Sequence, residues 1–120
     1  MHRWLLLLDP AAVLVFVAIG RDTHEEEATL AGLAETAAPF LIAVVIGWLV
    51  VRAWTAPTSS LTGAGVLATT VVLGMLLRNL VFGEGTAATF VLVATVFLAI
   101  LLLGWRLLAA QFTDRTPVDA

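Results

Sequence analysis

The sequence predicts an all-α polytopic membrane protein, a four-transmembrane-helix bundle in up-down order. Of its 120 residues, 61% are hydrophobic and 12% are charged, whereas a soluble domain is nearer half apolar and a quarter charged. A soluble fold of this size could not bury so much apolar side chain, because small domains keep a large exposed surface. The apolar residues also fall into four runs, each near the length of about 20 residues that crosses a bilayer.

Short polar segments separate the four runs. The predicted spans cover about residues 4–20, 37–54, 61–82 and 87–110, within one transmembrane domain of residues 1–112. The connecting segments are an acidic stretch at 21–35, a turn rich in proline and serine at 55–60 and a glycine turn at 83–85. Residues 113–120 are polar and predict a frayed C-terminal tail.

The first run raises the question of a cleaved signal peptide, because it follows a basic start at Arg3. Asp9 and Pro10 interrupt its apolar core early, and no small-x-small cleavage motif precedes Arg21. We therefore expect a retained helix.

Arginine supplies all the basic residues and predicts the orientation. The side that carries both termini holds more of them: Arg3, Arg52, Arg106 and Arg115, against Arg21 and Arg78 on the other. Cytoplasmic loops carry the excess of positive charge in membrane proteins. We therefore expect a multi-pass protein of the cell membrane with both termini in the cytoplasm.

Polar markers recur along the chain and predict an internal repeat. A Thr-Ala-Ala motif followed by phenylalanine opens both the second and the fourth span, at residues 36–40 and 86–90. A Gly-Trp pair lies near the end of each, at 47–48 and 104–105, and Arg52 and Arg106 follow. The markers indicate two parallel copies of one helical hairpin. Chance similarity in a sequence rich in alanine, valine and leucine is the alternative.

The same markers resemble those of a family of small four-helix membrane proteins known only as a domain of unknown function. The resemblance covers the chain from Asp9 to Arg106 and implies a topology without an assigned activity. The residues that carry it are Asp9, Phe16 to Arg21 with His24, Pro39-Phe40, Gly47-Trp48, Gly74 to Arg78, Gly85-Thr86 with Phe90, and Gly104 to Arg106.

Asp9 is the first candidate functional residue, and two interpretations stay open. A carboxylate within a membrane span is costly and is commonly retained for function, which would give Asp9 a role in handling protons or cations. Aspartate followed by proline is also a common helix start, with the aspartate as N-cap and Pro10 as the first helical residue.

Arg78 and Asn79 lie about one turn before the outer end of the third span. The guanidinium of Arg78 could extend to the lipid headgroups and have no further role. It could instead present a fixed positive charge to the bundle or to an outer vestibule, where it would pair with a carboxylate or attract an anion.

Arg21 and His24 are three residues apart and share a helix face if the first helix continues past Gly20. His24 precedes Glu25, Glu26 and Glu27, so it could sense pH. A solvated acidic loop is the simpler interpretation of this segment.

Small residues in the third span predict close helix packing or dimerisation rather than a solute path. Gly65 and Thr69 are four residues apart, as are Thr70 and Gly74, and such spacing lets helix backbones approach closely. In the fourth span, Thr86, Thr89 and Thr95 are expected to donate their hydroxyl hydrogen bonds to their own helix backbone.

No catalytic constellation is evident. The sequence lacks cysteine and tyrosine, and it lacks the nucleophile-elbow, zinc-protease, P-loop and dinucleotide-binding motifs. We therefore expect no enzyme activity, cofactor or metal. A net charge of −3 and the lack of a basic cluster also argue against nucleic-acid binding.

Two functions remain in view, with transport as the leading hypothesis and an accessory role as the alternative. The suspected repeat, Asp9 and Arg78 favour a small transporter or channel-like protein that acts as an oligomer, because four short helices rarely enclose a solute path alone. The small size and the helix faces rich in small residues favour an accessory or scaffold subunit of a larger membrane complex.

Overall fold

Four long helices and two short ones make up the computed structural model, which describes residues 3–23, 30–81 and 88–113. The chain begins with a short 3₁₀ helix, η1 (Arg3–Leu7), which leads into α1 (Leu8–Thr23). The remaining elements are α2 (Leu30–Val51), a second 3₁₀ helix η2 (Ala53–Thr55), α3 (Ser60–Leu80) and α4 (Ala88–Thr113). The predicted all-α fold is confirmed.

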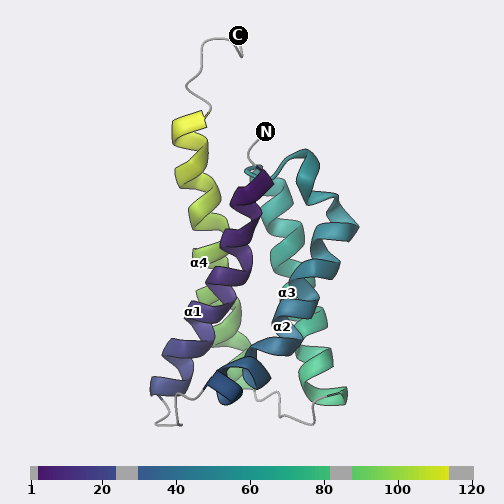
Figure 1. Ribbon diagram of the computed structural model, residues 1–120, viewed down its shortest axis with the longest axis vertical. Coiled ribbons are helices and arrows are strands. Elements are labelled where there is room, and N and C mark those ends of the chain that lie inside the picture. The colour runs from purple at the N-terminus through teal and green to yellow at the C-terminus, as the bar shows by residue number, and fades with distance from the viewer. Residues whose placement is uncertain (1–2, 24–29, 82–87, 114–120) are drawn as a thin grey trace.

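The helices form an up-down bundle in which α1 packs against α2 and α4, and α3 packs against α2 and α4. The start of η1 and the end of α4 lie at the same end of the bundle (Figure 1), which we call the terminal end. The opposite end carries the start of α2 and the end of α3 (Figure 1).

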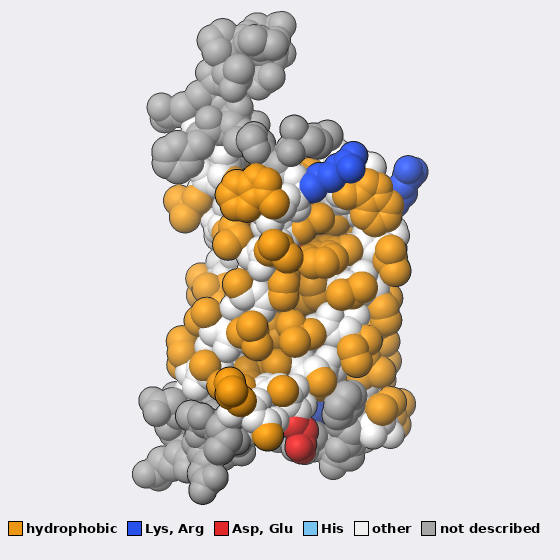
Figure 2. Space-filling view, viewed as in Figure 1, with side chains coloured by type: hydrophobic (Ala, Val, Ile, Leu, Met, Phe, Trp, Pro, Cys, Tyr) orange, Lys and Arg blue, Asp and Glu red, His pale blue; other side chains and the backbone are white. Residues whose placement is uncertain are grey.

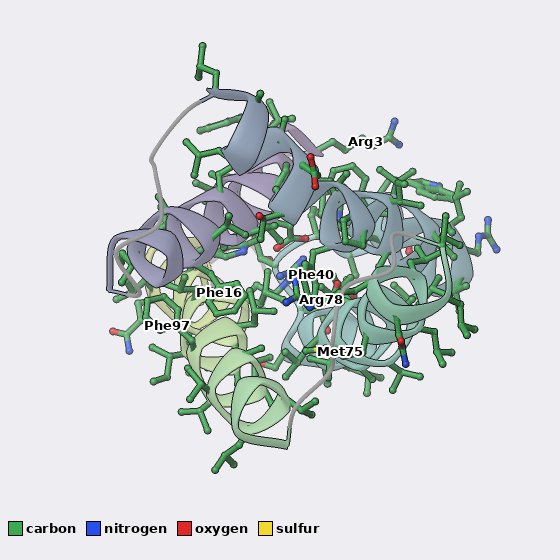
Figure 3. The ribbon with its side chains drawn as sticks, turned by 90° about the horizontal axis from the view of Figure 1, so that it is seen from below. Arg3, Phe16, Phe40, Met75, Arg78 and Phe97 are labelled. Carbon is green, nitrogen blue, oxygen red and sulfur yellow. The ribbon has the colours of Figure 1, made fainter. Side chains whose placement is uncertain are left out.

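The core is built from apolar side chains of all four helices. Phe16 of α1 packs edge-on against Phe40 of α2, with ring centroids 6.2 Å apart and an interplanar angle of 87°. The same ring lies 5.6 Å from the ring of Phe97 in α4. Figure 3 shows these three rings together, seen from the end opposite the termini. They join α1, α2 and α4 through aromatic contacts that add to simple apolar burial.

The face of the bundle seen in Figure 2 is apolar between its two ends. Four segments are long and apolar enough to cross a membrane, namely Arg3–Gly20, Leu30–Val51, Ser60–Leu80 and Val91–Gln111. Large apolar side chains such as Ile100 and Leu108 are about two-thirds exposed, at 66% and 65%. In a bilayer these side chains face an apolar solvent, so the chain is a four-span membrane protein.

The observed bounds differ most from the predicted spans in the first two helices. The second helix begins at Leu30 rather than near Ala37, because the leucines and alanines of this stretch are strong helix formers and the single Glu35 does not stop them. The first α-helix begins at Leu8 and runs past Gly20 to Thr23. The predicted glycine turn at 83–85 and residues 114–120 of the predicted tail lie outside the described residues.

Candidate functional site

The most distinctive polar group in the structure is the carboxylate of Asp9, which lies in the first turn of α1 and is fully buried. Its Oδ1 accepts hydrogen bonds from Trp105 Nε1 and Arg106 Nη1, both at 2.8 Å. Its Oδ2 accepts hydrogen bonds from Trp48 Nε1 at 2.9 Å and Arg106 Nη2 at 2.8 Å. We call Asp9, Trp48, Trp105 and Arg106 the ionic cluster.

Arg106 is also fully buried, and it has partners beyond the ionic cluster. Its Nε donates to the carbonyl oxygen of Pro57 at 2.9 Å, in the loop between α2 and α3. Its Nη1 donates to the carbonyl of Leu102 at 3.0 Å, one turn earlier in α4. The guanidinium carbon lies 4.3 Å from the centroid of the Trp105 ring, a cation–π contact. One side chain therefore connects α1, α4 and the α2–α3 loop.

A glycine makes room for this arginine. A Cβ atom on Gly63 of α3 would lie 2.7 Å from Arg106 Cδ and 2.9 Å from a methyl carbon of Leu103. The methylene stem of Arg106 thus passes over the bare backbone of α3. Gly63 is necessary for the cluster because any larger residue would occupy the space that the stem fills.

The two Gly-Trp pairs of the suspected repeat meet at one carboxylate. Trp48 from α2 and Trp105 from α4 each donate an indole hydrogen bond, to different oxygens of Asp9. The arginines that follow them are not equivalent, since Arg106 is buried whereas Arg52 is exposed beyond the end of α2. The two tryptophans therefore meet at one carboxylate, whereas the glycines before them and the arginines after them lie in different surroundings.

The geometry identifies the cluster as a closed ion pair. Arg106 engages Asp9 through both terminal nitrogens, the bidentate arrangement that gives a guanidinium–carboxylate pair its strength and direction. With the two indoles added, each carboxylate oxygen accepts two hydrogen bonds, which satisfies its lone pairs. A buried pair with this degree of satisfaction holds its helices in one arrangement, and loss of either partner leaves an uncompensated charge.

The structure thus does not use Asp9 as an N-cap. Asp9 lies inside α1, which begins at Leu8, and its oxygens accept from α2 and α4. Pro10 remains compatible with the helix because its missing N–H falls in the first turn, where that group has no partner within the helix.

The small residues of α3 pack against α2 within one chain. A Cβ on Gly65 would lie 2.5 Å from Val51 Cγ1, and a Cβ on Gly74 would lie 2.6 Å from Phe40 Cδ1. Thr69 donates its hydroxyl to the carbonyl of Gly65 at 2.9 Å, and its Cβ would lie 3.2 Å from a Cβ on Gly47 of α2. These contacts agree with the predicted helix packing and place it between α2 and α3.

Two threonines illustrate different solutions for a hydroxyl in an apolar bundle. Thr95 donates to the carbonyl of Val91 at 2.7 Å, so the expected backbone bond is confirmed for this residue. Thr86 and the side chain of Thr89 lie outside the described residues. Thr70 is fully buried, and its hydroxyl oxygen has no hydrogen-bond partner among the residues that the structure describes.

The other predicted polar residues lie away from the ionic cluster. Arg78 is half-buried in the last turn of α3 at the opposite end, and Asn79 is exposed beside it. Figure 3 places Arg78 near the middle of the bundle in projection, next to Phe40 and Met75. Arg21 belongs to α1, although its side chain lies outside the described part, as does His24 altogether. Within residues 3–23, 30–81 and 88–113, no three potential metal ligands come together.

Sequence reasoning found Asp9 but missed its partners. From the sequence, Trp48, Trp105 and Arg106 were identified only as markers of the repeat, the orientation and the family resemblance, and Gly63 and Pro57 were not singled out. A usable signal was depth, because Asp9, Trp105 and Arg106 all fall near the terminal ends of their predicted spans. A carboxylate and a guanidinium at one depth in the membrane are expected to pair.

Comparison with known proteins identifies the family without giving a function. The profile of one protein family, described as a protein of unknown function (DUF3054), matches residues 6–109. A search of curated proteins found no match, and neither did a search of solved structures. The match includes Asp9, Trp48, Trp105 and Arg106, so the whole ionic cluster lies within the matched region. The chain therefore belongs to the DUF3054 family of proteins of unknown function.

Proposed function

We propose that this protein is a non-catalytic accessory or scaffold subunit of a larger membrane complex. The observation that carries the proposal is the saturation of Asp9 by four hydrogen bonds. A carboxylate that binds protons or cations in turnover needs a free lone pair or a weak partner. Asp9 has a bidentate arginine instead, which supports a rigid building block over a moving carrier.

The outer face of α4 supplies a surface for a neighbouring helix. Val93, Val96, Ile100 and Leu107 are 51%, 51%, 66% and 57% exposed. Their spacing of three, four and seven residues places them along one side of the helix, as in a helix–helix seam. Gly104 lies within the same stretch, and a Cβ atom placed on it would have no heavy atom within 4 Å. A partner backbone could approach closely at that glycine.

Cysteine cross-linking in native membranes tests the scaffold proposal. The sequence contains no cysteine, so the wild-type chain does not react with the cross-linker and serves as the negative control. We expect Ile100→Cys to form one cross-linked adduct of defined mass with a different protein. The matched variant Leu102→Cys should form none, because Leu102 lies on the opposite face of α4 and is fully buried. Adducts at only twice the 12.7 kDa chain mass would contradict the proposal, because they indicate a homo-oligomer.

A transporter or channel-like protein that acts as an oligomer is the second candidate. It is favoured by Arg78, half-buried near the middle of the bundle in projection, and by the buried hydroxyl of Thr70 without a described partner. Such groups could line a solute path when a second copy or another conformation completes it.

Flux measurements in liposomes separate the two candidates. The scaffold proposal predicts no proton or solute flux from the purified wild-type chain. Transport predicts flux that Asp9→Asn and Arg78→Ala abolish. Thr70→Val then gives a further comparison, because removal of an unpaired buried hydroxyl should leave the fold intact while it lowers flux through a path that uses the hydroxyl.

We also propose that the chain resides in the cell membrane with both termini in the cytoplasm. The exposed Arg3 and Arg52 belong to the terminal end, and positive charge is retained on the cytoplasmic side. An impermeant thiol reagent applied to intact cells should label Glu35→Cys at the opposite end and spare Ala56→Cys beside η2, both exposed positions. The reverse pattern would invert the topology.

A further inference from the structure

We propose that Arg3 and Arg52, with Trp4 and Trp54, form a surface at the terminal end that binds the phosphate headgroups of anionic membrane lipids. The proposal is independent of whether the bundle acts as a scaffold or as a transporter. It rests on the position of two short helices, on the charges around them and on the backbone of Arg52.

The two arginines come from neighbouring elements of the terminal end. Arg3 is the first residue of η1, and Arg52 directly precedes η2. These two 3₁₀ helices contact each other, although their sequences are far apart. Both arginine side chains are exposed, and arginine side chains stand at the upper edge of the apolar surface in Figure 2. In a bilayer this edge lies at the level of the headgroups.

The charges of the described residues leave this end positive. The carboxylate of Asp9 is buried and committed to Arg106, and the exposed Glu35 lies in the first turns of α2, at the opposite end. Neither Arg3 nor Arg52 has an ion-pair partner within residues 3–23, 30–81 and 88–113. Two guanidiniums that have no counter-charge among the described residues suit a phosphodiester, whose oxygens match the planar fork of an arginine.

The backbone of Arg52 indicates that its side chain is retained for a reason. Arg52 follows the last residue of α2 with φ 53° and ψ 55°, in the left-handed region. This place after a helix favours glycine, because a Cβ is strained there. Arginine at this position keeps a positive charge there although its backbone conformation is strained. The favourable effect of a cation on the C-terminus of α2 is the competing explanation, and it does not depend on the lipid.

Two tryptophans complete the site. Trp4 follows Arg3 in η1 and is 66% exposed, and Trp54 lies within η2 and is half-buried. Indole rings settle at the membrane interface, with the apolar face toward the acyl chains and the N–H toward the headgroups. The pair therefore holds the two arginines at the depth of the phosphates.

The test compares thermal unfolding in vesicles of phosphatidylcholine alone and in vesicles with about one quarter phosphatidylglycerol. We expect the anionic lipid to raise the Tm of the wild-type chain. Arg3→Gln and Arg52→Gly should each lose much of this rise, and Arg52→Lys should keep part of it. Native mass spectrometry should show roughly five-fold weaker retention of phosphatidylglycerol for each arginine removed.

Arg52→Gly gives the sharpest result, because it should raise the Tm in phosphatidylcholine alone while it removes the response to the anionic lipid. Arg78→Gln is the matched control, with the same change of net charge at the opposite end, and it should keep the full response. The proposal is overturned if the Arg3→Gln/Arg52→Gly double variant responds like wild type, if Arg78→Gln loses the response equally, or if inorganic phosphate alone reproduces it.

Discussion

Arg106 and Asp9, 97 positions apart in the chain, form a bidentate ion pair with both hydrogen bonds at 2.8 Å and both side chains fully buried. The pair joins the first membrane helix to the last. Because Arg106 also donates to Pro57, the α2–α3 loop is held at the same point. The closure of the bundle at its terminal end thus depends on a few polar contacts within an apolar molecule.

Removal of the carboxylate charge should destabilise the bundle strongly. Asp9→Asn leaves the guanidinium of Arg106 buried without a counter-charge, which costs about 3–5 kcal/mol. Equilibrium unfolding in detergent micelles measures the loss. Glu35→Gln is the matched control, because this carboxylate is exposed, and it should change stability by less than about 0.5 kcal/mol. Equal effects of the two substitutions would show that the ion pair does not hold the bundle.

Exchange of the two charges should fail to restore stability. In Asp9→Arg/Arg106→Asp the attraction between the partners is retained, but the indole N–H groups of Trp48 and Trp105 would then point at a guanidinium. Indole nitrogens only donate hydrogen bonds, so both would lose their acceptor. The apolar pair Asp9→Leu/Arg106→Met should recover more stability than the exchange does, because it removes both charges together. Full recovery by the exchange would mean that the tryptophan bonds contribute little.

Each tryptophan of the ionic cluster should contribute separately measurable stability. Trp48→Phe and Trp105→Phe each remove one hydrogen bond to a different oxygen of Asp9, and bonds to a charged group contribute about 1.5–3 kcal/mol. The effects should not add in the double variant, because both bonds serve one carboxylate. Trp4→Phe serves as control, since Trp4 is 66% exposed. If either substitution lowers the stability no more than Trp4→Phe does, the indole hydrogen bond to Asp9 does not stabilise the bundle.

Replacing glycine by alanine should lower the stability at one position and raise it at another. In Gly63→Ala the new Cβ would lie 2.7 Å from Arg106 Cδ, and Arg106 cannot yield without breaking its bonds to Asp9 and Pro57. Overpacking of this kind costs about 1–3 kcal/mol. Gly104→Ala meets no heavy atom within 4 Å and should stabilise α4 by about 0.5–1 kcal/mol through helix propensity. The free energies of unfolding of the two variants check both predictions. If Gly63→Ala is more stable than wild type, the Arg106 stem does not pass as close to residue 63 as the structure shows.

Much of the fold followed from local features of the sequence. The apolar runs predicted four spans because transfer into a bilayer depends on the side chains of one helix at a time. The predicted boundaries were weakest around Leu30, where helix-forming residues precede the apolar run and hydropathy does not mark the start of the helix. Asp9 stood out because a carboxylate in an apolar run is rare, but rarity does not say what the carboxylate contacts.

The sequence alone determined the class of the protein, the four helices and the end of the bundle to which Asp9 and Arg106 belong. Only the tertiary structure decided that these two residues pair, that Trp48 and Trp105 share their carboxylate and that Gly63 leaves room for the arginine stem. Hydropathy sums over neighbours in the chain, whereas such contacts depend on the rotation of each helix about its axis. That rotation is set by the packing of all four helices together.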